Sequence, residues 1–132
     1  MTPRQRVEAV NAWAPIVGYA RAVRVGRQVI VAGTTATGAD GRVVARGDMH
    51  AQAMQALRNV ERALHEVGAS MRDVVRTRLY LTDIAQWEAA GRAHGEFFRD
   101  VRPAATMVEV SRLIDPDMLV EIEADAVIGE EE

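Results

Sequence analysis

Three carboxylates alternate along the last predicted strand of this 132-residue chain, and residues of this type can serve as general acids or bases. From Leu119 to Ile128, Glu121, Glu123 and Asp125 share one face of the strand and apolar residues share the other. The apolar set should face helices, so the carboxylates should lie on the uncovered face of a sheet. There they either meet water, the commoner outcome, or line a contact between subunits.

Other residue types give weaker signals. His50, His65 and His94 lack metal-ligand spacing, so no metal site is expected. A lone histidine such as His94, on the predicted apolar face of a helix, is more often a core or interface residue than a catalyst. Neither of the two serines lies in G-x-S-x-G, which excludes a serine hydrolase of that type. The chain has no lysine and no cysteine, which excludes lysine Schiff bases, disulfides and thiolate chemistry.

Hydroxylated and basic segments offer places to hold an anion. The run 32–38 lacks the lysine and the following helix of a phosphate-binding loop. A strand end of this kind could hold a carboxylate, although a plain strand-to-loop junction is the commoner case. Arginines cluster at 21, 24 and 27 and at 72, 76 and 78. Pairing of Arg76 and Arg78 with Glu121 or Glu123 is our first interpretation. The alternative is that any of the six arginines clamps a substrate carboxylate through two hydrogen bonds.

Apolar periodicity predicts the elements that position these residues. A hairpin is expected over 21–31, with its turn at Gly26-Arg27, and a second turn at Asp40-Gly41 precedes a short strand over 42–44. Helical spacing predicts a helix from an Asp48 N-cap to Gly68. A strand over 75–81, a helix with Trp87, Ala90, Gly91, His94, Phe97 and Phe98 on one face, and neighbouring strands over 105–113 and 119–128 should follow. Ala105, Met107 and Glu109 should share a face, where Met107 suits a buried contact and favours self-association.

These elements predict one two-layer α+β domain over 1–132, with two helices packed on a mixed sheet. Residues 1 to about 14 should form a flexible, loosely packed arm, and 129–132 a solvated tail.

All 16 basic residues are arginine, and the 19 acidic residues bring the net charge to −3, so nucleic-acid binding is not expected. No apolar run approaches the roughly 18 residues of a membrane span, and the first residues lack an apolar signal core. We therefore expect a cytoplasmic protein with no membrane partner.

Short motifs occur in a fixed order between about residues 16 and 128. They include Gly18-Tyr19, Val31-Ala32-Gly33, Leu81-Thr82-Asp83, Arg102-Pro103-Ala104, Val108-Glu109-Val110-Ser111-Arg112-Leu113 and Val120-Glu121-Ile122-Glu123-Ala124. This ordered set resembles the Rid family, also called YjgF-like proteins. The resemblance implies a chorismate-mutase-like fold and a homotrimer with three clefts between subunits, in agreement with an open sheet face.

The resemblance also implies an activity: cofactor-free hydrolysis of reactive enamines and imines, such as 2-aminoacrylate, to a 2-keto acid and ammonia. In that mechanism an arginine holds the substrate carboxylate, and a glutamate with an ordered water assists attack on the iminium carbon. The glutamate position falls on Glu121. The other ligand-binding positions fall on Tyr19, Gly33, Thr34, Trp87 and Met107.

One position departs from the family's deaminases, because Ala105 stands where they carry arginine after the Pro-Ala pair. Loss of that charge-assisted pair removes about 2 to 5 kcal/mol of carboxylate binding in a desolvated site. On the second helix, Gly91 replaces a frequent asparagine and has Arg92 and His94 as neighbours. We therefore expect an altered substrate range. If 2-imino acids are nevertheless hydrolysed, Arg92 or another arginine that reaches into the cleft should compensate for Ala105.

Two functions from different classes remain open. The first is hydrolysis of an imine, enamine or related small metabolite with Glu121 as general acid or base, for example by a pathway deaminase similar to 2-aminomuconate deaminase. The second is a non-catalytic trimer that binds or senses a small molecule, because a cleft without the arginine can bind a metabolite and leave it unreacted. The endoribonuclease activity ascribed to some relatives is not expected, given the acidic pI and the lack of a histidine pair.

Overall fold

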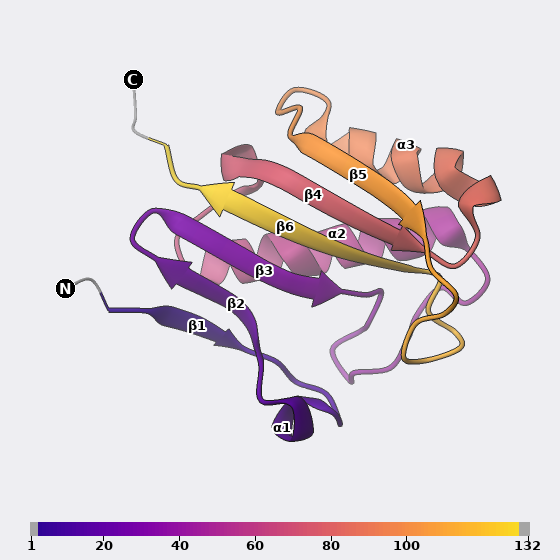
Figure 1. Cartoon of the computed structure of the whole chain (residues 1–132), viewed down its shortest axis with the longest axis horizontal. Coiled ribbons are helices and arrows are strands. Elements are labelled where there is room, and N and C mark those ends of the chain that lie inside the picture. The colour runs from indigo at the N-terminus through magenta and orange to yellow at the C-terminus, as the bar shows by residue number, and fades with distance from the viewer. Residues whose placement is uncertain (1–2, 130–132) are drawn as a thin grey trace.

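Six strands form one mixed sheet in the computed structural model, which describes residues 3–129. The strands are β1 (Gln5–Glu8), β2 (Ala20–Val25), β3 (Gln28–Thr34), β4 (Val74–Leu81), β5 (Ala104–Glu109) and β6 (Val120–Val127). Their order is β1-β2-β3-β6-β4-β5, and only β4 and β5 run parallel (Figure 1). The strand with the strict alternation of carboxylate and apolar side chains is therefore an inner strand.

Helices cover one face of this sheet. The covering helices are α2 (Met49–Glu66) and α3 (Trp87–Phe98), which lie together behind the strands in Figure 1. The short helix α1 (Ala14–Val17) lies apart from them, between β1 and β2 along the chain. Val120, Ile122 and Ala124 of β6 are buried in the same core cluster as Leu57 and Leu64 of α2. The predicted α+β class, with two helices on a mixed sheet, is confirmed. Among residues 3–129, no helix combines the length and apolarity needed to cross a bilayer.

Local signals set the ends of α2 as predicted. The Asp48 carboxylate accepts a hydrogen bond from the Ala51 N–H at 3.0 Å and so caps the first turn. At the other end Gly68 adopts φ 82°, a left-handed conformation that glycine reaches without strain. Arg24 then donates to the Val67 carbonyl at 2.6 Å, which ties the end of the helix to β2.

The N-terminal segment differs from its prediction. Residues 5–8, expected in a loosely packed arm, form the edge strand β1, with Gln5 opposite Arg24 and Val7 opposite Ala22. A strand at the edge of a sheet pairs through its backbone N–H and C=O groups. It can therefore form without the alternation of apolar and polar side chains by which strands are predicted from sequence. The short strand expected over 42–44 is wrong, since only an isolated bridge joins Thr37 to Val43. Of the predicted tail, residues 130–132 lie outside the described residues.

Three features of the structure differ from the predicted strand pairing and the predicted buried faces. A register shift between Val74 and Arg76 makes Val74 3% exposed and leaves Val75 49% exposed, although Val75 was predicted to face the core. Strand β5 pairs with β4 and not with β6, to which it was assigned as neighbour. On α3, Trp87 is 57% exposed and not part of the buried face.

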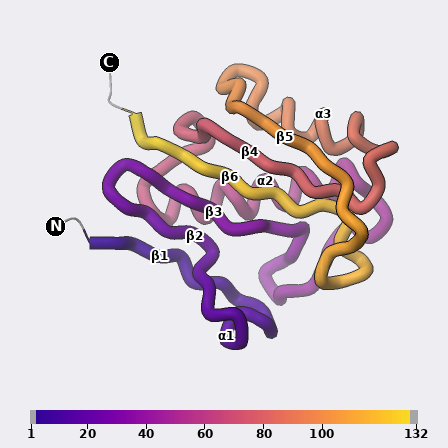
Figure 2. Tube along the Cα trace, viewed as in Figure 1, coloured from indigo at the N-terminus to yellow at the C-terminus, as the bar shows by residue number. Residues whose placement is uncertain are grey.

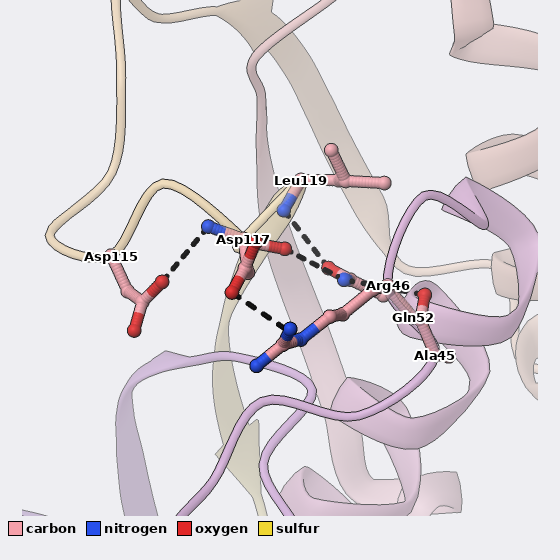
Figure 3. A network of polar contacts seen from close by, with 6 residues as sticks. All are labelled: Ala45, Arg46, Gln52, Asp115, Asp117 and Leu119. Carbon is pink, nitrogen blue, oxygen red and sulfur yellow. Dashed lines mark hydrogen bonds and ion pairs between the residues drawn. The ribbon is translucent and has the colours of Figure 1, made fainter.

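A buried glutamine fixes the start of β6. The segment between β5 and β6 passes beside the segment between β3 and α2 (Figure 2). Gln52 of α2, fully buried, joins them: its amide donates to the Asp117 carbonyl at 2.9 Å and accepts from the Leu119 N–H at 2.9 Å (Figure 3). Arg46 adds an ion pair with Asp117 at 3.3 Å. The network ends two residues before Glu121.

We expect Gln52→Leu to lower the free energy of unfolding by about 1–3 kcal/mol, because it leaves the Asp117 carbonyl and the Leu119 N–H without their partner. Urea denaturation would measure the loss. Gln55→Leu is the matched control on the same helix. Within residues 3–129 the Gln55 amide hydrogen-bonds only to the side chain of Asn59, so a change of about 0.5 kcal/mol or less is expected. Equal losses in the two variants would contradict this role for Gln52.

Candidate functional site

A cavity of about 800 Å³ opens where β3 ends. Its walls come from the N-terminal segment, the end of β3 with the following loop, α2, the segment before β6, and β6 itself. Four of the residues expected in the site line it together: Tyr19, Gly33, Thr34 and Glu121. Asn59 of α2 holds the loop after β3 in place, because its amide donates to the carbonyls of Thr35 at 3.0 Å and Thr37 at 2.9 Å.

Glu121 is a half-buried carboxyl group packed on a glycine. A Cβ placed on Gly33 would lie 2.8 Å from Cδ of Glu121, so a larger residue at this position would displace the carboxyl group. Burial raises the pKa of Glu121, the negative charge of Glu123 raises it further, and the positive charge of Arg21 opposes both. Glu121 is therefore easier to protonate than an exposed glutamate, which suits a group that first gives and then takes a proton.

Tyr19 lies at the centre of a polar network beside Gly33. Its hydroxyl oxygen accepts from Asn11 Nδ2 at 2.6 Å and from Arg21 Nη2 at 3.0 Å. Arg21 also donates through Nη1 to the Gly33 carbonyl at 2.6 Å and to Thr34 Oγ1 at 3.0 Å. Its guanidinium lies 5.5 Å from the centre of the Tyr19 ring. Arg21 thus connects β2 to the end of β3 inside the cavity.

A second network on the open face holds Glu123. The Tyr80 hydroxyl donates to Glu123 at 2.6 Å, and Arg78 forms ion pairs with Glu123 at 3.9 Å and Asp125 at 3.6 Å. The hydrogen bond to Glu123 raises the pKa of Tyr80. Cross-strand pairing of Arg78 with Glu123 is as predicted.

The remaining expected site residues lie elsewhere. Trp87 and Arg92 are on exposed parts of α3, where Arg92 pairs with Glu88. His94 is half-buried: it hydrogen-bonds Thr77 at 2.8 Å, packs against Phe98 at 4.6 Å between ring centres, and has its pKa lowered by burial. The lining of the cavity includes none of these three.

Ala105 and Met107 also lie away from the cavity. Ala105 is exposed on β5 and is level with Thr77, while Met107 is level with the buried Leu79 and packs against the core. Both positions therefore belong to the helix-covered side of the sheet, and the prediction that Met107 lies on the open face is wrong. The cause is the parallel pairing of β5 with β4, which aligns residues 105 and 107 with inward-facing positions.

Sequence reasoning missed Asn11 of the site. It named Arg21 only as one of six clustered arginines and Glu123 only as one of three carboxylates on the open face, without placing either beside Tyr19 and Glu121. The hairpin register, with Ala22 opposite Val31, puts residues 21 and 32 on the same face and was the available signal for Arg21. Asn11 fell in the segment treated as an arm. Within residues 3–129 there is no group of three or more His, Asp or Glu side chains that could hold a metal ion.

Comparisons with known proteins extend over nearly the whole chain. A family model described as Endoribonuclease L-PSP matches residues 9–128. The crystal structure of a Mycobacterium tuberculosis member of the YjgF/YER057c/UK114 family is 47% identical, with a TM-score of 0.86 over 96% of this chain and 100% of the other.

Two relatives are similar in sequence. An uncharacterised protein of Streptomyces coelicolor is 39% identical over 95% of this chain and 92% of its own length. A 3-aminoacrylate deaminase of Acinetobacter baylyi is 32% identical over 82% of this chain and 85% of its own length.

Proposed function

Because the chain belongs to the endoribonuclease L-PSP family, also named YjgF or Rid, we propose that it hydrolyses a reactive imine or enamine of a small metabolite. The observation that carries the proposal is Glu121: a carboxyl group with a raised pKa, packed on Gly33 in a cavity that also holds Tyr19 and Thr34. The deaminase name of the Acinetobacter relative supports the reaction class.

The proposed reaction adds water to a C=N bond. Protonated Glu121 gives its proton to the imine nitrogen, or to the terminal carbon of an enamine, which leaves an electrophilic iminium carbon. The Glu121 carboxylate then takes a proton from water as the water oxygen bonds to that carbon. Glu121, now protonated, returns a proton to the nitrogen of the resulting carbinolamine. The C–N bond breaks and ammonia leaves, while the hydroxyl oxygen forms the C=O bond and its proton passes to the Glu121 carboxylate. The step needs no cofactor, because water is the only co-reactant.

An imine-trapping assay tests the proposal. An amino-acid oxidase generates 2-imino acids, and semicarbazide traps those that are not hydrolysed. We expect the purified protein to suppress trapping in proportion to its concentration. No suppression by this protein, alongside full suppression by a known imine deaminase, would exclude hydrolysis of simple 2-imino acids.

We further propose that the working site lies between subunits of a homotrimer. Trp87, Arg92, His94 and Ala105 lie on α3 and β5, at the opposite edge of the sheet from β1 and β2. Only a neighbouring copy could bring that edge to the cavity that contains Glu121. Light scattering on the purified protein should give three times the mass of one chain, and a monomer would contradict an inter-subunit site.

Ala105 favours a second candidate, a metabolite-binding protein without turnover. It places no charge where the resemblance implies the arginine that holds the substrate. A ligand that binds only the folded state raises the melting temperature whether or not it reacts. A keto, amino or aromatic acid that raises the melting temperature without being consumed would support this alternative, and failure of all of them would count against it.

A further inference from the structure

The cavity contains hydrogen-bond donors for which the described residues provide no acceptor. The Asn11 side chain is oriented by the Ala14 N–H, which donates to its Oδ1 at 2.7 Å, so Nδ2 faces Tyr19. The Tyr19 oxygen accepts from both Asn11 and Arg21, which fills its two lone pairs. Its own hydrogen has to be donated to a different atom, and no side chain or carbonyl within residues 3–129 accepts it.

Arg21 likewise has an N–H donor and a positive charge that the described residues leave without a partner. Its hydrogen-bond acceptors are uncharged oxygens of Gly33, Thr34, Tyr19 and, at 3.5 Å, Ala32. In the described part of the chain no carboxylate forms an ion pair with it, and its Nε–H has no acceptor. The charge of Arg21 acts on the Glu121 carboxyl group, but the two form no ion pair. An arginine is charged at all physiological pH values, so a half-buried guanidinium with no carboxylate in contact favours an anionic ligand.

Arg21 differs in this from the other arginines of the cavity. Arg62 and Arg112 also line it, but both are exposed to solvent, where water screens their charge. Arg21 lies against the Tyr19 ring and is held by β3, so its direction is fixed before a ligand arrives. Fixed donors lose little entropy on binding.

We propose that Arg21 and Tyr19 of one subunit together bind a carboxylate of the ligand, and that Arg21 thereby supplies the cation that Ala105 does not. Gly33 lies between Arg21 and Glu121: its carbonyl accepts a hydrogen bond from Arg21, and its Cα faces the Glu121 carboxyl group. A carboxylate at Arg21 therefore directs the neighbouring carbon toward Glu121. A singly charged group suits the site better than a phosphate, because Glu121 and Glu123 also line the cavity. The assignment of the reacting carbon rests on the proposed function.

Binding of pyruvate and of pyruvamide, its uncharged counterpart of equal size, tests the inference by calorimetry without any turnover. The unmodified protein should bind pyruvate at least about tenfold more tightly than pyruvamide. Arg21→Met should weaken pyruvate binding by about 10- to 100-fold and remove the preference. Tyr19→Phe, which loses only the hydroxyl donor, should weaken pyruvate binding about tenfold.

Arg112→Met is the matched control, since it removes an exposed arginine of the same cavity and should leave the preference unchanged. Equal binding of the two probes by the unmodified protein, loss of the preference in Arg112→Met, or its retention in a folded Arg21→Met would each overturn the inference. If Arg21→Met does not fold, Arg21→Gln takes its place, since it is uncharged but can still donate to the Gly33 carbonyl, and a full preference retained in that variant overturns the inference. A preference for pyruvate with no suppression of imine trapping would refute the proposed function alone.

Discussion

Glu121→Gln is expected to reduce kcat for imine hydrolysis by about 10²- to 10⁴-fold, the usual contribution of a positioned general acid or base. Glutamine has nearly the same shape but can neither give nor take the proton. Stability should not fall. Burial raises the pKa of Glu121, so its ionised form costs free energy in the folded state, and the unfolding free energy at pH 8 should be equal or higher in the variant. Imine trapping and urea denaturation measure the two effects.

The pH dependence gives an independent check. The proton-donating step needs protonated Glu121, so its rate falls as pH rises through the raised pKa of Glu121. Glu123→Gln removes a negative charge that contributes to this rise, which moves the fall in rate to a lower pH. The profile of kcat against pH should therefore shift toward acid in Glu123→Gln. A shift toward higher pH, or undiminished turnover in Glu121→Gln, would remove Glu121 from the mechanism.

Gly33→Ala should cost about two orders of magnitude in kcat, because a misplacement of a catalytic group by about 1 Å has an effect of that size. The added Cβ would lie 2.8 Å from Cδ and 2.9 Å from Oε1 of Glu121. These atoms form the flexible end of the side chain, so they move and the fold persists. The expected result is a protein with a nearly unchanged melting temperature and a displaced carboxyl group, measured by thermal denaturation and imine trapping.

Gly91→Ala provides the control for a methyl group added elsewhere. On α3 the nearest atom to the new Cβ would be Cε3 of Trp87 at 3.9 Å, an ordinary contact. Alanine in a helix interior is favoured over glycine by about 1 kcal/mol, so this variant should be slightly more stable and equally active. Full activity in Gly33→Ala, or loss of folding there, would contradict the packing role assigned to Gly33.

The sequence predicts the helices and β6 well because their signals are local. Asp48 and Gly68 bracket α2, and the alternation from Val120 to Ala126 identifies both faces of β6. Features that depend on which strands pair with each other cannot be predicted from local sequence. Nothing in the run from Val74 to Arg76 marks the bulge, which forms only where β4 meets β6.

The site was predictable in part for the same reason. Glu121, Tyr19, Gly33 and Thr34 follow from short motifs, and the structure brings them to one cavity. The place of Arg21 depends on a long side chain that reaches from β2 across to the Gly33 carbonyl on β3. Its conformation is set by the oxygens around it, which no one-dimensional pattern contains.

The position of β6 has a consequence for how the chain folds. Residues 120–127 join β3 to β4, yet both of those strands precede β6 along the chain. During synthesis the hairpin of β2 and β3 and the pair of β4 and β5 each present an unpaired edge until β6 has been made. The sheet closes through contacts between residues far apart in the sequence, such as Val29 with Ala126, 97 positions later, and such distant contacts slow folding. A nascent chain arrested before residue 120 should therefore need protection from aggregation.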